Sequence, residues 1–296
     1  MRVLITGASG FIGAQLGRTL AKTHDVLGVA WTSQHSPDFP TCRLDLTEQD
    51  ASRKLLEGFP ADVVIHAAAM SRVVKCEEHP AKAEEINVHA TRELACQTAA
   101  HGARFLFFSS DMVFSGETGC YTEQSPLSPQ NAYGRTKLRA ETAVLEANAR
   151  NLVVRLNLVV GRGEGFGTSF TERILEEIDK RGKASLFADQ FRSPIHVRSV
   201  VSAVVLLMEK RITGILHLGG PQRLSRAELG RALCRAAGIK EKAVAECSYL
   251  VHPQAALLPR DTSFGVGRRE VELPELEVRP IETELVADFL KERVMP

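Results

Sequence analysis

The sequence predicts an α/β fold in which a doubly wound parallel sheet is joined by a smaller C-terminal lobe. Short β-branched runs alternate with longer helical patterns from the start of the chain, and a glycine-rich turn follows the first of these runs. This alternation stops after Val160. Strict alternation of strands and helices is typical of a parallel sheet with helices on both faces. The 296 residues, of which 44% are hydrophobic, are enough for such a domain and a smaller lobe.

The first half of the chain supplies most of the predicted sheet. Strands are predicted at Arg2–Thr6, Val26–Ala30, Cys42–Leu44, Val63–His66, Arg104–Ser109 and Leu152–Leu156. Helices are predicted at Phe11–Ala21, Ala51–Leu56, Ala81–Ala100 and Tyr133–Ala149. Later elements are helices at Phe170–Lys180 and His196–Lys210 and a strand at Ile215–Leu218. We assign residues 1–160, rejoined by about 195–220, to the sheet domain, and residues 161–194 and 221–296 to the lobe.

Composition and charge argue against several classes of protein. A net charge of +1 gives no support for binding to nucleic acid or to a membrane surface. The longest apolar run, Val200 to Met208, is far shorter than the ~20 residues that span a bilayer. The six cysteines are scattered without a zinc-site spacing, so we expect free thiols and no metal. Because the chain begins with a strand-like segment rather than a signal peptide, we expect a soluble cytoplasmic protein.

The first functional signal is the turn between the first strand and the first helix. Three glycines at three-residue spacing occur in Thr6-Gly7-Ala8-Ser9-Gly10-Phe11-Ile12-Gly13. The pyrophosphate of a dinucleotide needs a tight turn, a close approach to the backbone and amide N–H groups at a helix N-terminus. This turn is therefore predicted to bind a dinucleotide, as in a Rossmann-type fold. The predicted contacts are Gly7, Ser9, Gly10, Phe11, Ile12 and Gly13.

The end of the second strand bears on which dinucleotide is bound. NAD sites usually place a carboxylate there to accept from the ribose 2′-OH, but Ala30 is followed by Trp31, Thr32, Ser33 and Gln34. A 2′-phosphate would meet no repulsion and could use the Thr32 hydroxyl. The sequence thus favours NADP(H), with NAD(H) possible.

Two further segments at strand ends are predicted to contact the cofactor. Asp45 and Leu46 end the third strand, where the carboxylate could accept from the adenine amino group. Ala67, Ala68 and Ala69 follow the fourth strand, and their small side chains would let the backbone lie against the ribose. A helix-capping loop and close helix–sheet packing are the respective alternatives.

Three residues form the candidate catalytic set. Tyr133 and Lys137 are four residues apart and so share one helix face. A free tyrosine titrates near pH 10, so we expect the Lys137 ammonium to favour the phenolate and to hold the nicotinamide ribose. Ser110 follows the fifth strand, where it could hydrogen-bond a substrate carbonyl while Tyr133 protonates the alkoxide. An exposed aromatic–lysine pair and a strand-end cap are the structural alternatives.

These motifs resemble the extended short-chain dehydrogenases/reductases and, more narrowly, the dTDP-4-dehydrorhamnose reductase group. The matching residues are Thr6 to Gly13, His66 to Ala69 with Glu77 and Pro80, Ile86 to Val88, Ser109 to Gly116, Tyr121 to Glu123, Pro126, Asn131 to Leu138, Glu141, and Asp189 to Pro194. The resemblance implies an NADP-binding Rossmann domain, a substrate-binding lobe and a possible homodimer. It also implies NADPH-dependent reduction of a 4-keto group on a nucleotide-linked deoxysugar by Ser110, Tyr133 and Lys137.

The predicted substrate site departs from the group's pattern. Members commonly carry an aromatic residue at Met112 and a tryptophan near Leu158. Asp111 and Met112 are expected in the sugar pocket. Arg192 and Arg260 are candidates for the substrate diphosphate, because a guanidinium suits phosphate geometry.

Two alternative functions use the same fold. A sugar-nucleotide epimerase or dehydratase is less favoured, because dehydratases of this type carry an acidic pair after the serine strand and here only Asp111 follows Ser110. The second alternative is a non-catalytic, dinucleotide-binding regulatory subunit like that of methionine adenosyltransferase. The presence of Ser110, Tyr133 and Lys137 favours catalysis.

Overall fold

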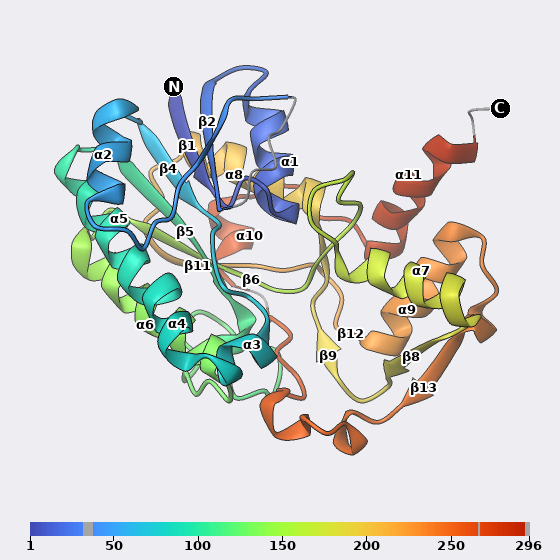
Figure 1. Ribbon diagram of the computed structural model, residues 1–296. Coiled ribbons are helices and arrows are strands. Elements are labelled where there is room, and N and C mark those ends of the chain that lie inside the picture. The colour runs from blue at the N-terminus through green and yellow to red at the C-terminus, as the bar shows by residue number, and fades with distance from the viewer. Residues whose placement is uncertain (32–37, 266, 294–296) are drawn as a thin grey trace.

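The computed structural model describes residues 1–31, 38–265 and 267–293 and contains a seven-stranded parallel sheet (Figure 1). Its strands are β1 (Arg2–Thr6), β2 (Asp25–Ala30), β3 (Thr41–Arg43), β4 (Val63–His66), β5 (Arg104–Ser110), β6 (Leu152–Leu156) and β11 (Gly214–Leu218). The order is β11-β6-β5-β4-β1-β2-β3, and every pairing is parallel. The predicted fold class is confirmed. Strand order reverses between β1 and β4, and ligands of such sheets bind beyond the carboxyl ends of the strands at that point.

Helices cover both faces of the sheet (Figure 1). They are α1 (Phe11–Leu20) and α8 (Val197–Glu209) on one face and α2 (Ala51–Gly58), α5 (Ala90–Ala100) and α6 (Ala132–Ala147) on the other. On the first face Leu16 of α1 and Val204 of α8 are completely buried. On the second face Leu56, Leu94 and Val144 are completely buried. Burial of apolar area on both sides holds the sheet between two helical layers.

The lobe has a core of its own beside the sheet (Figure 1). Its main elements are α7 (Phe170–Arg181), β8 (Ala184–Phe187), α9 (Arg226–Ala237), β13 (Val244–Cys247) and α11 (Ile281–Arg293). Two short strand pairs lie at its base, β7 (Val159–Val160) with β10 (Ile195–His196) and β9 (Phe191–Arg192) with β12 (Leu224–Ser225). Both α7 and α9 begin with a capping box, formed by Ser169 with Glu172 and by Ser225 with Glu228.

Several predicted elements differ from those in the structure. The predicted helix over 81–100 consists of α4 (Pro80–Glu84), a π-helical turn (Glu85–His89) and α5. The predicted helix at His196 begins at Val197, because the His196 ring accepts from the Arg198 N–H and acts as the N-cap. The remaining helices are α3 (Val73–Glu78), α10 (Arg268–Glu272) and 3-10 turns at Asp111–Val113, Glu241–Ala243, Tyr249–Val251 and Ala255–Leu257.

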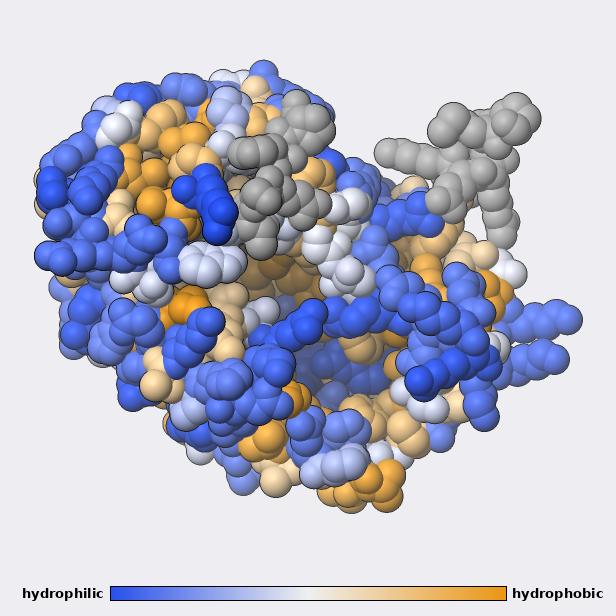
Figure 2. All heavy atoms as spheres, viewed as in Figure 1, coloured by the Kyte–Doolittle hydropathy of each residue, from blue (hydrophilic) through white to orange (hydrophobic). Residues whose placement is uncertain are grey.

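The surface in view is mainly hydrophilic, with a hollow between the sheet domain and the lobe (Figure 2). Within the part of the chain that the structure describes, no helix has the length and apolar character needed to cross a bilayer.

Candidate active site

A cleft of about 940 Å³ opens at the carboxyl ends of the strands, where the lobe faces the sheet (Figure 2). It is lined by the β1–α1 turn, by residues after β3, β4 and β5, by α6, and by α7, β9 and α9. The structure brings together here almost every residue that the sequence predicted for cofactor, catalysis or substrate. The exceptions are Thr32, which lies outside the described residues, and Arg260, which is exposed and does not line the cleft.

The glycine-rich turn forms a cradle at one end of the cleft. Gly7 has a φ of +71°, and a Cβ there would lie 2.7 Å from the backbone nitrogen of Ala68. A Cβ on Gly13 would lie 2.2 Å from the carbonyl oxygen of Gly7. The turn closes with a 2.9 Å bond from the Gly10 N–H to that same oxygen, and α1 starts at the next residue. Backbone without side chains, next to a helix N-terminus, fits a dinucleotide pyrophosphate.

The adjoining wall is held by a buried histidine. His66 is bonded to the hydroxyls of Thr6 (2.6 Å) and Thr91 (2.9 Å), and the Ala68 N–H donates to the Thr6 oxygen at 3.2 Å. Burial lowers the pKa of His66 to about 3, so the ring is neutral at physiological pH. These bonds fix the end of β4, where Ala67 to Ala69 line the cleft.

Asp45 also lines the cleft but has a local role in its loop. Its Oδ1 accepts from the Thr47 N–H at 2.9 Å and from the Thr47 hydroxyl at 2.7 Å. These bonds form a local turn after β3 and cap no helix, because α2 begins at Ala51 with Asp50 as its N-cap. Both bonds use Oδ1, and neither involves Oδ2.

Ser110, Tyr133 and Lys137 meet in the middle of the cleft. The Ser110 hydroxyl accepts a hydrogen bond from the Met112 N–H at 3.2 Å and donates one to Asp111 at 2.9 Å. It lies close enough to the Tyr133 hydroxyl to favour the phenolate and so to oppose part of the rise in the pKa of Tyr133. Tyr133 is in the first turn of α6, whose N-cap Asn131 accepts from the Gly134 N–H at 2.8 Å. One turn further on, the Lys137 Nζ lies 3.9 Å from the centroid of the Phe107 ring.

Burial controls the ionisation of this set. It raises the pKa of Tyr133 well above its usual value, and the negative charge of Asp111 adds to the effect. It lowers the pKa of Lys137 to about 7, against the opposing effect of the Glu141 carboxylate. Lys137 is not among the groups that shift the pKa of Tyr133, so stabilisation of the phenolate by Lys137 stays a prediction. The neutral phenol is favoured because desolvation penalises the charged form.

Asp111 and Arg192 are bound to one another at the base of the cleft. The Arg192 Nε lies 3.2 Å from Asp111 Oδ2, which also accepts from the Thr262 hydroxyl. Other Arg192 nitrogens donate to the carbonyls of Phe191 (2.6 Å) and Pro259 (3.2 Å). Arg192 is only 2% exposed, so most of its hydrogen-bonding capacity joins protein segments.

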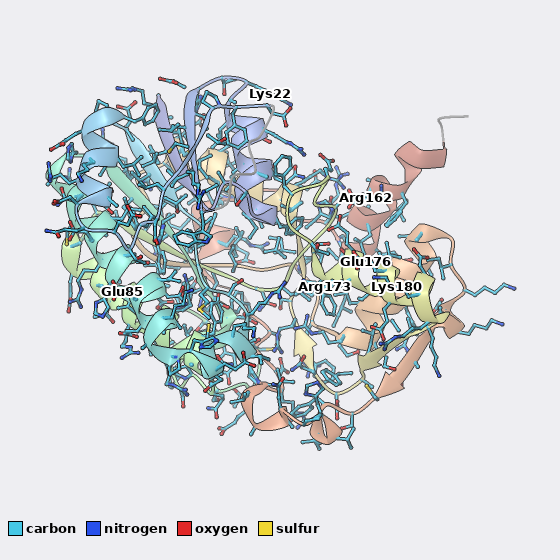
Figure 3. The ribbon with its side chains drawn as sticks, in the orientation of Figure 1. Lys22, Glu85, Arg162, Arg173, Glu176 and Lys180 are labelled. Atoms are coloured by element: carbon cyan, nitrogen blue, oxygen red, sulfur yellow. The ribbon has the colours of Figure 1, made fainter. Side chains whose placement is uncertain are left out.

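Sequence reasoning missed two arginines of the lobe. Arg173 of α7 and Arg226 of α9 both line the cleft, and Figure 3 shows Arg173 at the end of α7 nearest the sheet domain. The Arg226 Nε donates to Gln190 at 3.2 Å, but its buried Nη1 has no hydrogen-bond partner among the described residues. Burial is the main cause that lowers the pKa of Arg226 to about 9, and repulsion from the Arg192 charge is the second cause.

The cleft as a whole is positively charged. Among the residues that the structure describes, seven basic side chains line it: Arg72, Lys75, Lys82, Lys137, Arg173, Arg192 and Arg226. Three acidic side chains from the same part of the chain line it: Asp45, Glu85 and Asp111. The whole chain has a net charge of only +1, so positive charge is concentrated in this cleft, as expected of a site for anionic ligands. No pattern in the sequence distinguishes these basic residues from the other members of a set of 37.

Comparisons with known proteins agree with this fold. Residues 1–286 match the family model described as RmlD substrate binding domain. The dTDP-4-dehydrorhamnose reductase of Mycolicibacterium smegmatis is 33% identical over 271 residues, covering 90% of this chain and 79% of the relative. Methionine adenosyltransferase 2 subunit beta of Rattus norvegicus is 31% identical over 289 residues, covering 95% of this chain and 82% of the relative.

A solved structure is similar over almost its full length. The dTDP-4-dehydrorhamnose reductase of Bacillus anthracis, crystallised in complex with NADP, has a TM-score of 0.87 at 25% identity and covers 98% of this chain and 99% of its own. Family match, relatives and structure all extend across both the sheet domain and the lobe. The chain belongs to the RmlD substrate binding domain family.

Proposed function

We propose that the protein is an NADPH-dependent reductase that converts a 4-keto group of a nucleotide-linked deoxysugar into an alcohol. The observation that carries this proposal is the shared cleft: Ser110, Tyr133 and Lys137 line the same 940 Å³ space as the glycine-rich turn. That space joins a dinucleotide cradle to a positively charged region on the lobe side. The reductases of the family with which the chain aligns over nearly its whole length support the same activity.

The cofactor residues fit NADP(H), with NAD(H) possible. The Gly7 to Gly13 turn would hold the pyrophosphate, and Ala67 to Ala69 would lie against the ribose. Lys137 would bind the hydroxyls of the nicotinamide ribose. The relative from Bacillus anthracis was crystallised with NADP, which supports NADPH here. A bound reduced nicotinamide supplies the hydride.

Ser110 and Tyr133 then act on the substrate carbonyl. The Ser110 hydroxyl would turn its proton from Asp111 to the carbonyl oxygen and hold that oxygen within reach of the Tyr133 hydroxyl. The raised pKa of Tyr133 keeps its proton in place at neutral pH, so the residue is a proton donor rather than a base in the direction of reduction. The proton passes to the alkoxide oxygen as the C–H bond forms.

The substrate diphosphate belongs at the arginines of the lobe. Arg226 lines the cleft and its buried Nη1 has no hydrogen-bond partner among the described residues, and Arg173 lies on the neighbouring helix. Arg192 already binds Asp111, so we assign it a supporting role, and Arg260 lies outside the cleft lining. Two guanidinium groups on one wall suit a diphosphate better than a single phosphate.

A regulatory subunit is the second candidate. The observation that favours it is the 31% identity to methionine adenosyltransferase 2 subunit beta over 95% of the chain. Such a protein would bind a dinucleotide and a partner enzyme without turning over a sugar. The intact Ser110, Tyr133 and Lys137 set favours the reductase.

The test combines binding and turnover. Purified protein is titrated with NADPH and NADH while nicotinamide fluorescence is followed, and dTDP-4-keto-6-deoxyhexose is then added while NADPH absorbance is recorded. Turnover is expected in the wild type and in Tyr249→Phe, whose side chain lies outside the cleft lining. Tyr133→Phe should bind NADPH but lose turnover.

Each other outcome has a definite meaning. Tight NADPH binding with no turnover, together with stoichiometric co-purification of another enzyme, would favour the regulatory subunit. Failure to bind either dinucleotide would overturn both candidates. Turnover that survives in Tyr133→Phe would remove Tyr133 from the proposed chemistry.

A further inference from the structure

A buried ion pair lies one helical turn behind Lys137, outside the set of groups that would touch the ligands. Arg155 Nη2 of β6 lies 2.7 Å from Glu141 Oε2 of α6, and Arg155 Nε lies 3.0 Å from Glu141 Oε1. The two side chains are 0% and 3% exposed. A third group joins them, because the Ser109 hydroxyl donates to Glu141 Oε1. Glu141, which is part of α6, thus accepts hydrogen bonds from side chains of both β5 and β6.

These bonds connect the pieces of the proposed catalytic set. Ser109 directly precedes Ser110, and in the β5–β6 register Ser109 is opposite Arg155. On α6, Lys137 is one turn and Tyr133 two turns before Glu141, so all three share a face. The Glu141 carboxylate therefore ties the helix that carries Tyr133 and Lys137 to the strand end that carries Ser110.

The same carboxylate is the negative charge behind the Lys137 ammonium. Lys137 is 2% exposed and lies against the Phe107 ring. Burial lowers the pKa of Lys137 to about 7, and among its neighbours Glu141 opposes that fall. Other titratable or charged groups around the set are His66 of β4, Tyr133 of α6, Asp111 after β5, Cys76 of α3, Arg155 of β6, and His217 with Glu123 beside Arg155.

A purely structural role leaves this arrangement unexplained. Replacing a buried ion pair by apolar side chains of similar volume often leaves the stability of a protein unchanged or increases it. Attaching α6 to the sheet therefore does not require an ion pair. A carboxylate is required if a buried ammonium nearby has to remain charged. Ser109, which adds a third bond to one carboxylate oxygen, restrains the direction in which that oxygen points.

We propose that Glu141 is a positioning residue for the reduction: it aligns α6 with the ends of β5 and β6 and supplies the counter-charge that holds the Lys137 ammonium ready for the nicotinamide ribose. This inference rests on the proposed function for its substrate. Its effect on Lys137 is also measurable by NADPH binding alone.

The decisive variant is Glu141→Gln, compared with Glu146→Gln on an exposed part of the same helix. Loss of the carboxylate lowers the pKa of Lys137, so the protonated form is lost at lower pH. NADPH affinity, followed by fluorescence across pH, should therefore fall off about one pH unit earlier than in the wild type. We expect kcat to drop by about tenfold. The decrease of kcat/KM at alkaline pH should also begin at a lower pH than in the wild type. Glu146→Gln should match the wild type in both measurements.

Two further variants separate positioning from folding. Glu141→Gln leaves Arg155 as an unpaired buried charge, which destabilises the fold, whereas the double variant Glu141→Gln with Arg155→Met removes both charges. The proposal predicts that the double variant regains thermal stability but keeps the earlier alkaline loss of NADPH binding. Ser109→Ala, which leaves the ion pair intact, should lower kcat while the pH dependence of NADPH binding stays close to that of the wild type.

A double variant with wild-type stability, wild-type kcat and wild-type pH dependence of NADPH binding would overturn the proposal and leave Glu141 a purely structural residue. The proposed function fails separately, if the wild type itself never oxidises NADPH with keto-sugars. An earlier loss of NADPH binding in Glu141→Gln would even then support the link between Glu141 and Lys137.

Discussion

At the scale of single residues, burial decides what each charged group in the cleft can do. Tyr133 and Lys137 were identified by their spacing, but their proton affinities follow from the space around them. Asp111 and Arg192 neutralise one another. Arg226 differs because its Nη1 is buried without a partner among the described residues. An unsatisfied buried donor costs free energy, and a ligand oxygen would recover it.

Removal of this guanidinium should therefore weaken substrate binding specifically. Arg226→Ala is expected to raise KM for the nucleotide sugar by about ten- to hundredfold, because a hydrogen bond to a charged group contributes roughly 1.5–3 kcal/mol. Calorimetric affinity for dTDP should fall in parallel, while NADPH affinity stays unchanged. Arg231→Ala, on the same helix but paired with Glu246 outside the cleft lining, is the matched control. Equal dTDP affinity in both variants would exclude Arg226 from the substrate site.

At the scale of elements, the start of α1 shows how closely the backbone of the glycine-rich turn is packed. The helix can begin where it does only because Gly13 carries no Cβ against the Gly7 carbonyl. Local sequence predicted this turn well, since a glycine pattern, a strand and a helix start all lie within a few residues. The π-helical turn at Glu85–His89 was not predicted, although Glu85 and Ile86 line the cleft.

Gly13→Ala tests the cradle directly. The added methyl would lie 2.2 Å from backbone oxygen, so the turn must shift. We expect loss of NADPH binding and a free energy of unfolding lowered by about 1–3 kcal/mol. Gly58→Ala, at the end of α2 where the added methyl meets no atom within 4 Å, should keep both properties. NADPH fluorescence and urea unfolding measure the two effects, and normal NADPH affinity in Gly13→Ala would contradict the proposed cradle.

At the scale of the whole molecule, two buried histidines make stability depend on pH. Burial lowers the pKa of His66 to about 3 and that of His217 to about 4, below the ordinary value near 6.5. As pH falls below about 6.5, the unfolded chain takes up protons that the folded chain does not, so the free energy of unfolding decreases. The loss approaches about 1.4 kcal/mol per pH unit for each histidine until the folded pKa is reached.

Urea unfolding between about pH 7 and pH 5 measures this slope. His66→Gln should be less stable than the wild type at neutral pH, because the bonds to Thr6 and Thr91 change, yet its stability should depend less steeply on pH. The exposed His79→Gln should retain the wild-type slope. A His66→Gln slope equal to that of the wild type would show that His66 takes no part in the acid sensitivity.

The sequence by itself determined the α/β class, the main strands, the glycine-rich turn before α1 and the helical spacing of Tyr133 and Lys137. These features depend on local periodicity, on glycine geometry and on short spacings, all of which are encoded within a few neighbouring residues. The tertiary structure decided which arginines line the cleft, which carboxylates are already paired and in which direction burial shifts the pKa of Tyr133. Those properties depend on burial and on contacts between segments as distant as Arg192 and Asp111, or Glu141 and Arg155, and desolvation in such contacts has no signature in the linear chain.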